Sequence, residues 1–327
     1  MLTIAKVISA SLVAAALIGC GRGSRDAECF DVAVVMDAGG LGDKGKNDMV
    51  WRGCQRFAEE SGVAARVCNY EPVSEDEGRG YLREASEDRA DVIIVASPVW
   101  EAYVHSLARD HRRTFYVVVD GEKGAANVKS LSFPAADAGY LMGVAAAAAV
   151  PAGSYAFLGG REDGPTKELA AGYRRGIESE NPSSSVAVVY AGEDFAAPVA
   201  RDRVRVLAGG LYDDGAAVIF AAAGIANADV AAVAKERDKL VIGYESNQNY
   251  LEPGYVITSL NIRWDNVVFE ELREVASGDS KGGEREISIA SDYISYPIDD
   301  NNRSLIPAEA VRKIEAARQR LAAGIAG

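Results

Sequence analysis

The chain has 327 residues, of which 48% are hydrophobic and 25% are charged. A chain of this length favours two lobes with sizeable cores, and its ordinary composition excludes wholesale disorder. The formal net charge of −13 argues against nucleic acid and anionic lipid surfaces as partners, because both are recognised through basic patches.

The first 19 residues are predicted to form a signal peptide. A short positive segment precedes an apolar stretch over residues 7–18, which is too short to span a bilayer comfortably. The four residues that end at Cys20, LIGC, resemble a bacterial lipobox, which implies cleavage before Cys20 and acylation of that cysteine. We therefore expect a permanent lipid anchor on a cell membrane, facing the periplasm or the exterior, with a tether over residues 20–27. The alternatives are a plain signal peptide and an uncleaved anchor.

Three further cysteines, Cys29, Cys54 and Cys68, follow the anchor. An exported protein can form disulfides, but an odd number leaves one thiol over, and the sequence does not fix a pair. The chain has no CxxC pair, and its two histidines, His105 and His111, fall in one predicted helix. We therefore expect no metal site.

The stretch over residues 37–53, DAGGLGDKGKNDMVWRG, organises the first half of the chain. It directly follows an apolar, β-branched run that is typical of a buried parallel strand, and its glycines allow a sharp turn before a helix. Ligands of open α/β sheets bind at the carboxyl ends of such strands. We therefore expect Asp37, Asp43, Lys46 and Asn47 to face a ligand in an open crevice.

Strands and helices alternate regularly through the first half. Strands are predicted over residues 30–36, 64–70, 91–96, 114–119 and 128–133. Helices are predicted from about residue 47 and over residues 74–89 and 98–113. This alternation with short loops predicts a parallel sheet that is covered by helices on both faces.

The pattern repeats after a helix of small residues over residues 135–150. Strands are predicted over residues 154–158, 186–190, 217–220, 240–243 and 255–260, with a Gly159-Gly160 turn after the first of them. Helices are predicted over residues 167–179, 199–212, 226–238, 266–276 and 307–322. Because the first half lacks a closing strand, we expect crossovers between the lobes. Lobe one is predicted to contain residues 28–133 and about 261–284, lobe two residues 134–260 and about 285–306, and a C-terminal helix residues 307–327.

Enzyme classes find little support. Residues 40–45 formally match GxGxxG, but the glycines begin late after the strand and Asp37 would repel a pyrophosphate. The chain has no Gly-x-Ser-x-Gly elbow and no cysteine–histidine arrangement that would indicate hydrolysis. We therefore expect a protein without catalytic residues and without a cofactor.

Several motifs occur in order and carry a family resemblance. They are DAGGLGDKGKN at 37–47, VDG at 119–121, FLGG at 157–160, GY at 172–173, NP at 181–182, AAG at 222–224, IG at 242–243 and PGYVITS at 253–259. Together they resemble the basic membrane protein family over about residues 31–277. The resemblance implies a lipoprotein with a type 1 periplasmic-binding-protein fold, in which a hinge joins two Rossmann-like α/β lobes. Many members are purine nucleoside receptors that serve the permease and ATPase of ABC importers, and some in spirochaetes bind riboflavin.

The resemblance also implies where the ligand binds. Asp37, Asn47 and Asp120 match the family pattern, and Phe195 lies within one residue of the family's aromatic position. Lys46 replaces the aromatic residue that stacks on the purine in the family.

Other family positions also differ in this chain. An Asp-x-Asp-Gln segment becomes Glu245-Ser-Asn247-Gln, and Ile262 stands where a lysine is usual. Trp100 and Tyr244 are candidate replacements for the lost stacking face, although Trp100 can equally serve to cap a helix. The candidate ligand-binding set is Asp37, Lys46, Asn47, Trp100, Asp120, Phe195, Tyr244, Glu245 and Asn247.

These departures set the order of the expected ligands. Loss of the aromatic, aspartate and lysine positions weakens the case for a purine nucleoside, so riboflavin is predicted first and a purine nucleoside second. In both cases the two lobes close over a small heterocyclic ligand, carboxylates hold its hydroxyl groups and aromatic faces hold its ring. A sensor or adhesin with the same fold is compatible with the same residues.

Overall fold

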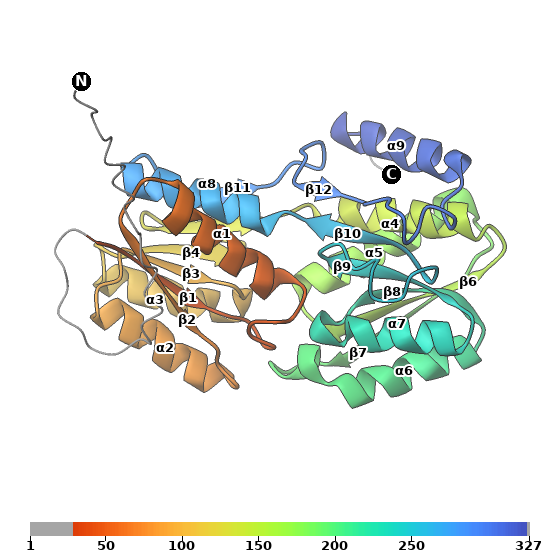
Figure 1. Ribbon diagram of the computed structural model, residues 1–327, viewed down its shortest axis with the longest axis horizontal. Coiled ribbons are helices and arrows are strands. Elements are labelled where there is room, and N and C mark those ends of the chain that lie inside the picture. The colour runs from red at the N-terminus through yellow and green to blue at the C-terminus, as the bar shows by residue number, and fades with distance from the viewer. Residues whose placement is uncertain (1–28, 326–327) are drawn as a thin grey trace, which may run out of the picture.

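The computed structural model describes residues 29–325. The predicted signal peptide and the whole tether, including Cys20, therefore lie outside the described residues. Two α/β lobes lie side by side, lobe one on the left and lobe two on the right of Figure 1. Within residues 29–325, no helix is both long and apolar enough to cross a membrane.

Lobe one is built around the first six-stranded sheet. Its strands are β1 (Phe30–Val35), β2 (Ala65–Tyr70), β3 (Val92–Val95), β4 (Phe115–Val119), β5 (Val128–Ser132) and β11 (Gly283–Glu286). Its helices are α1 (Lys46–Glu60), α2 (Glu75–Glu87), η1 (Pro98–Trp100), α3 (Glu101–Asp110) and α8 (Trp264–Ser277).

Lobe two is built around the second six-stranded sheet. Its strands are β6 (Ser154–Arg161), β7 (Val186–Gly192), β8 (Ala216–Ala222), β9 (Leu240–Glu245), β10 (Val256–Ile262) and β12 (Ile294–Ser295). Its helices are α4 (Ala135–Ala149), α5 (Gly164–Glu180), η2 (Ala197–Val199), α6 (Arg201–Asp213), η3 (Gly224–Ala226), α7 (Asn227–Glu236) and α9 (Ala308–Ala322).

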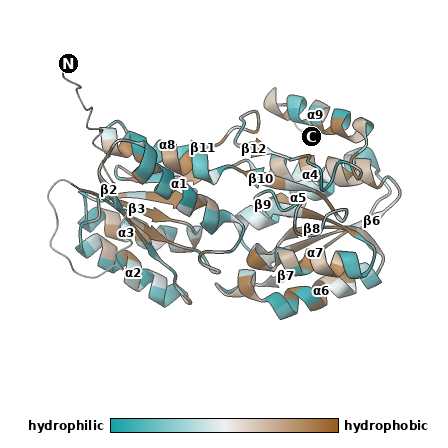
Figure 2. Ribbon diagram, viewed as in Figure 1, coloured by the Kyte–Doolittle hydropathy of each residue, from teal (hydrophilic) through white to brown (hydrophobic). Residues whose placement is uncertain are grey.

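The two sheets share one topology. Their orders are β11-β5-β4-β3-β1-β2 and β12-β10-β9-β8-β6-β7, so β6 takes the place in lobe two that β1 takes in lobe one. All strand pairs are parallel except β10 with β12. Figure 2 shows hydrophobic strands inside and a largely hydrophilic α2 outside, as expected for a sheet covered on both faces. This confirms the predicted fold class.

The chain crosses between the lobes after β5, after β10 and after β11. The predicted end of the second lobe-one segment, at residue 284, falls inside β11. The strand belongs to lobe one and continues two residues further, to Glu286. At the hinge, the rings of Phe133 and Trp264 meet edge to face with centroids 6.3 Å apart. Both rings belong to a hydrophobic core that continues from one lobe into the other.

Helices α4 and α5 pack with almost no side chain between them. A Cβ atom added to Gly172 would lie 1.9 Å from the backbone oxygen of Ala136, and one added to Gly143 would lie 2.2 Å from the backbone oxygen of Tyr173. The predicted helix of small residues therefore lets the two backbones approach closely.

One difference from the predicted elements bears on the site. β6 does not stop before Gly159 and Gly160 but continues through them as strand to Arg161. The longer strand carries the Arg161 side chain to the edge of the sheet that faces lobe one.

Candidate functional site

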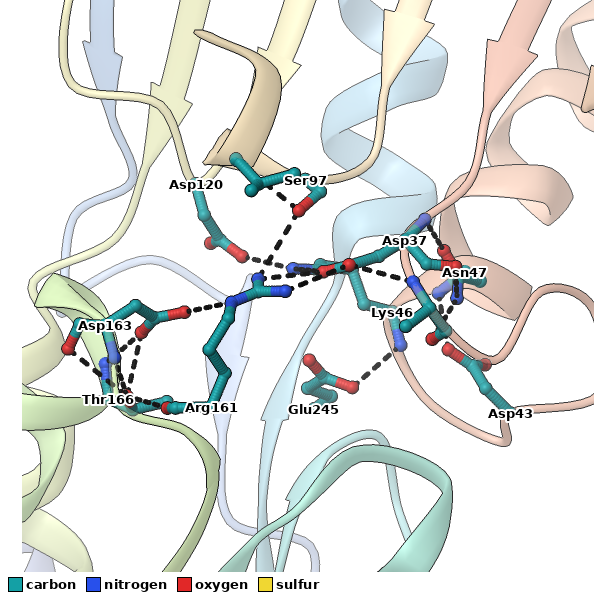
Figure 3. A network of polar contacts seen from close by, with 12 residues as sticks. Asp37, Asp43, Lys46, Asn47, Ser97, Asp120, Arg161, Asp163, Thr166 and Glu245 are labelled. Atoms are coloured by element: carbon teal, nitrogen blue, oxygen red, sulfur yellow. Dashed lines mark hydrogen bonds and ion pairs between the residues drawn. The ribbon is translucent and has the colours of Figure 1, made fainter. Parts of the chain in front are cut away.

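The site lies where the carboxyl ends of both sheets face each other. A cavity there is lined by six residues of the candidate ligand-binding set, Asp37, Lys46, Asn47, Asp120, Tyr244 and Glu245, and by Asp43, which was also expected to face a ligand. Arg161, Asp163 and Thr166 also line it and were not predicted. Figure 3 shows the polar members of this set converging from both lobes.

The glycine-rich loop before α1 is fixed by its own side chains. The Asn47 side chain accepts from the Asp37 backbone N–H at 2.9 Å and donates back to the Asp37 carbonyl at 3.3 Å. Asp43 accepts from the backbone N–H groups of Gly45, Asn47 and Asp48. Asn47 therefore holds the loop to the end of β1, and Asp43 accepts from the first turn of α1, which uses much of their hydrogen-bonding capacity.

Lys46 is a buried cation between carboxylates. Its Nζ lies 2.7 Å from Asp120 Oδ2 and 3.5 Å from Asp37 Oδ2. Burial alone would lower the pKa of Lys46, but Asp120, Asp37 and Glu245 together raise it well above its ordinary value. The ammonium group therefore stays charged and partly neutralises the site.

Arg161 reaches across from lobe two. Its Nη atoms lie 3.4 and 3.5 Å from the Asp37 carboxylate and 3.4 Å from Ser97 Oγ, while Nε lies 3.2 Å from Asp163. Asp163 is held in turn, because it forms a capping box with Thr166 at the start of α5. Burial would raise the pKa of Asp37, but the charges of Arg161 and Lys46 outweigh this effect and lower it.

Asp37 and Asp120 are therefore not exposed carboxylates in an open crevice, as the sequence led us to expect. Both are buried and ion-paired. One oxygen of Asp120, Oδ1, is buried and accepts no hydrogen bond from any described residue.

Glu245 brings lobe two against the start of α1. Its Oε2 accepts from the Lys46 backbone N–H at 3.0 Å. A Cβ atom on Gly45 would lie 2.4 Å from this oxygen, so only glycine leaves room for the contact. Burial is the main effect that raises the pKa of Glu245 to about 8; Lys46 opposes it, and Asp43 and Asp120 add to it.

The cavity measures about 60 Å³, which is room for a few water molecules. Tyr244 is the aromatic residue among those that line it. A nucleoside or a flavin therefore requires the lobes to separate, or the Arg161 and Lys46 side chains to move.

Trp100 and Phe195 meet each other outside the residues that line this cavity. Their ring centroids lie 5.2 Å apart, and Phe195 of lobe two joins a hydrophobic cluster of lobe one. The indole of Trp100 donates to the backbone oxygen of Glu75 and lies where a Cβ atom on Gly78 would be. In this arrangement Trp100 packs inside lobe one, and Phe195 packs against it from lobe two. The predicted contact of either ring with a ligand stays a prediction.

Asn247 also lies apart from the cavity lining. It is exposed, and its side chain donates to Asp299 at 3.0 Å. Among residues 29–325, no group of three or more His, Cys, Asp or Glu side chains is arranged to hold a metal ion.

Sequence reasoning missed Arg161, although a signal was present. Arg161 lies at the carboxyl end of the first strand of the second α/β repeat, as Asp37 lies just beyond the carboxyl end of the first strand of the first repeat. Interpreting Gly159-Gly160 as a turn ended the strand too early and hid this correspondence.

Comparison with known proteins places this geometry in context. The chain is 26% identical to the CD4+ T-cell-stimulating antigen of Listeria innocua, over 98% of this chain and 97% of the relative. It is 26% identical to the ABC transporter nucleoside-binding protein BmpA of Lactococcus lactis, over 75% of each chain.

Solved structures agree on the fold. An ABC transporter solute-binding protein from Aeropyrum pernix superposes with a TM-score of 0.80 at 20% identity, covering 90% of this chain and 92% of its own. The family model described as "ABC transporter substrate-binding protein PnrA-like" matches residues 30–320. The resemblance to basic membrane proteins is thereby confirmed, and the chain belongs to the PnrA-like Bmp family of substrate-binding proteins, the non-catalytic ligand receptors of ABC transporters.

Proposed function

We propose that this substrate-binding protein captures a neutral purine nucleoside by closing its lobes and delivers it to an ABC permease and ATPase. The observation that carries this proposal is that both cations of the buried site are already paired. Lys46 is paired with Asp120 and Asp37, and Arg161 with Asp37 and Asp163, so an anionic ligand would be left without a partner.

The remaining carboxyl groups offer an anion no further partner. Asp43 accepts from three backbone N–H groups, Asp163 pairs with Arg161 and caps α5, and the raised pKa of Glu245 favours its neutral form near pH 7. A neutral ligand with several hydroxyl groups suits such a site, because carboxylate oxygens accept strongly from hydroxyls.

The lining favours a nucleoside over riboflavin, which reverses the order set by the sequence. Tyr244 supplies the aromatic face at the cavity, and its ring packs edge to face on Phe220 with centroids 6.2 Å apart. One such face suits a purine better than the broader isoalloxazine. The Lactococcus relative is named for nucleoside binding, which supports the same choice.

Titration calorimetry with inosine, guanosine, adenosine, riboflavin and guanosine monophosphate tests the proposal. We expect a nucleoside to bind most tightly and the monophosphate far more weakly, because its charge has no partner in the site. Tight binding of the monophosphate would overturn the charge argument. Tight binding of riboflavin alone would replace the nucleoside and leave the receptor role.

We also propose that the receptor is anchored through Cys20 by acyl chains. The LIGC pattern at the end of the apolar stretch supports this proposal.

A further inference from the structure

The buried site contains a hydrogen-bond donor on Arg161 and an acceptor on Asp120 that the described residues leave unused. The donor is the second hydrogen on Arg161 Nη1, since this atom donates only to Asp37 Oδ1. The acceptor is Asp120 Oδ1. Figure 3 shows both side chains pointing toward the same space between the lobes.

Arg161 is held firmly at its base and loosely at its tip. Nε lies 3.2 Å from Asp163, which the capping box of α5 fixes in place. The contacts of Nη1 and Nη2 are all 3.4–3.5 Å, beyond the usual 2.7–2.9 Å of a charge-assisted hydrogen bond. A ligand acceptor in the cavity can therefore compete with Asp37 for these hydrogens.

Lys46 is less available, although it lines the same cavity. Its Nζ makes the short 2.7 Å contact to Asp120 Oδ2. The same contact fixes the Asp120 carboxylate and leaves Oδ1 buried without a hydrogen-bond partner among the described residues. The pair therefore presents Asp120 as an acceptor and Arg161 as the adaptable donor.

We infer that Arg161 and Asp120 recognise a lactam edge, a ring carbonyl beside a ring N–H, with the carbonyl on Arg161 and the N–H on Asp120. This inference rests on the proposed function and narrows its ligand to 6-oxopurine nucleosides. Arginine has only donors, so it favours a carbonyl and disfavours an amino group. Inosine and guanosine have this edge, whereas adenosine has an amino group in place of the carbonyl. Riboflavin carries the same edge on its isoalloxazine ring.

Calorimetry with inosine and adenosine tests the inference on the whole mature chain. The variant Arg161→Gln removes the charged donor, and Arg161→Lys keeps the charge opposite Asp37 but loses the planar fork. The control is Arg205→Gln, which removes an exposed arginine of lobe two that pairs with Glu236. Thermal unfolding of each variant shows whether it is folded.

We expect the wild-type protein and the Arg205→Gln variant to bind inosine at least about tenfold more tightly than adenosine. Arg161→Gln should weaken inosine binding by about tenfold or more and leave adenosine binding nearly unchanged, and Arg161→Lys should lose most of the preference. If Arg161→Gln does not fold, the Arg161→Lys result decides.

Other results separate this inference from the proposed function. Equal binding of inosine and adenosine by the wild-type protein would overturn the inference and leave nucleoside capture standing. Binding of riboflavin alone, lost in Arg161→Gln, would support the lactam contact and overturn the nucleoside. A protein that binds none of the three compounds would overturn both.

Discussion

Asp37 and Arg161 are structural counterparts that meet across the two lobes. Each follows or ends the first strand of its lobe's sheet, β1 or β6, and the guanidinium Nη2 lies 3.4 Å from Asp37 Oδ2. Equivalent positions of the two repeats thus carry an acidic side chain in lobe one and a basic side chain in lobe two. Their contact links the lobes while leaving the guanidinium loosely held.

Replacing Lys46 by methionine should destabilise the protein strongly. The ammonium group is buried beside Asp120 and Asp37, and removing one partner of a buried pair leaves charges uncompensated. We expect the free energy of unfolding in urea to fall by about 3–5 kcal/mol. The control Lys167→Met breaks the exposed pair with Glu162 and should cost about 0–1 kcal/mol. Equal losses in the two variants would contradict the structural account of Lys46.

Stability should depend on pH through Glu245. Its pKa is raised from 4.5 to about 8, so the folded protein binds this proton more tightly than the unfolded chain does. The stabilisation of the folded state by the protonated Glu245 is therefore complete below about pH 4.5 and is lost as the pH rises through 8. Unfolding midpoints of the wild-type protein should fall relative to those of Glu245→Gln between pH 5 and 8.5. The exposed control Glu193→Gln should follow the wild type, and parallel curves for Glu245→Gln would refute the assignment.

Phe195 should control how readily the lobes close. Its ring packs on Trp100 of the other lobe, and Phe195→Ala removes that contact without opening either sheet. An aromatic pair contributes about 0.5–1.5 kcal/mol beyond burial, so ligand affinity should fall by up to about tenfold. Small-angle scattering should show a larger radius of gyration. Phe195→Leu keeps an apolar side chain, so its affinity and radius of gyration should lie between those of the wild type and Phe195→Ala. If Phe195→Ala leaves both measurements unchanged, the contact does not govern closure.

Glycine is required between α4 and α5 for space. Gly172→Ala would place a Cβ atom 1.9 Å from the Ala136 backbone oxygen, and forcing the helices apart should cost about 1–3 kcal/mol. Gly210 in α6 has no atom within 4 Å of the corresponding Cβ position, so Gly210→Ala should stabilise the protein by about 0.5–1 kcal/mol. Urea denaturation of both variants measures the difference, and stabilisation by Gly172→Ala would contradict the close packing.

The anchor prediction concerns Cys20, which precedes the described residues. Cys20→Ala should leave the precursor unprocessed and without acyl chains, because the motif requires the thiol. Partitioning into Triton X-114 with mass spectrometry of the product checks this. An alanine variant that still carries the acyl mass would refute lipidation at this residue.

The sequence by itself determined the family and the order of the main strands and helices, although it did not predict the short strands β11 and β12. The apolar, β-branched runs and the small-residue helix occupy the elements that they predict, because burial on both faces of a parallel sheet leaves a strong local pattern. The glycine-rich loop also identified the correct edge of the sheet, since Asp37, Lys46 and Asn47 all line the cavity.

Only the tertiary structure decided how the charges are paired and which rings are available. Lys46 meets Asp120 across 74 positions of sequence, Asp37 meets Arg161 across 124, and the Lys46 backbone meets Glu245 across 199. Local sequence patterns cannot predict contacts between residues that lie so far apart in the sequence. Phe195 of lobe two covers Trp100 of lobe one, which the sequence also did not predict. Whether a side chain at a strand end faces a ligand or the other lobe depends on how the lobes close.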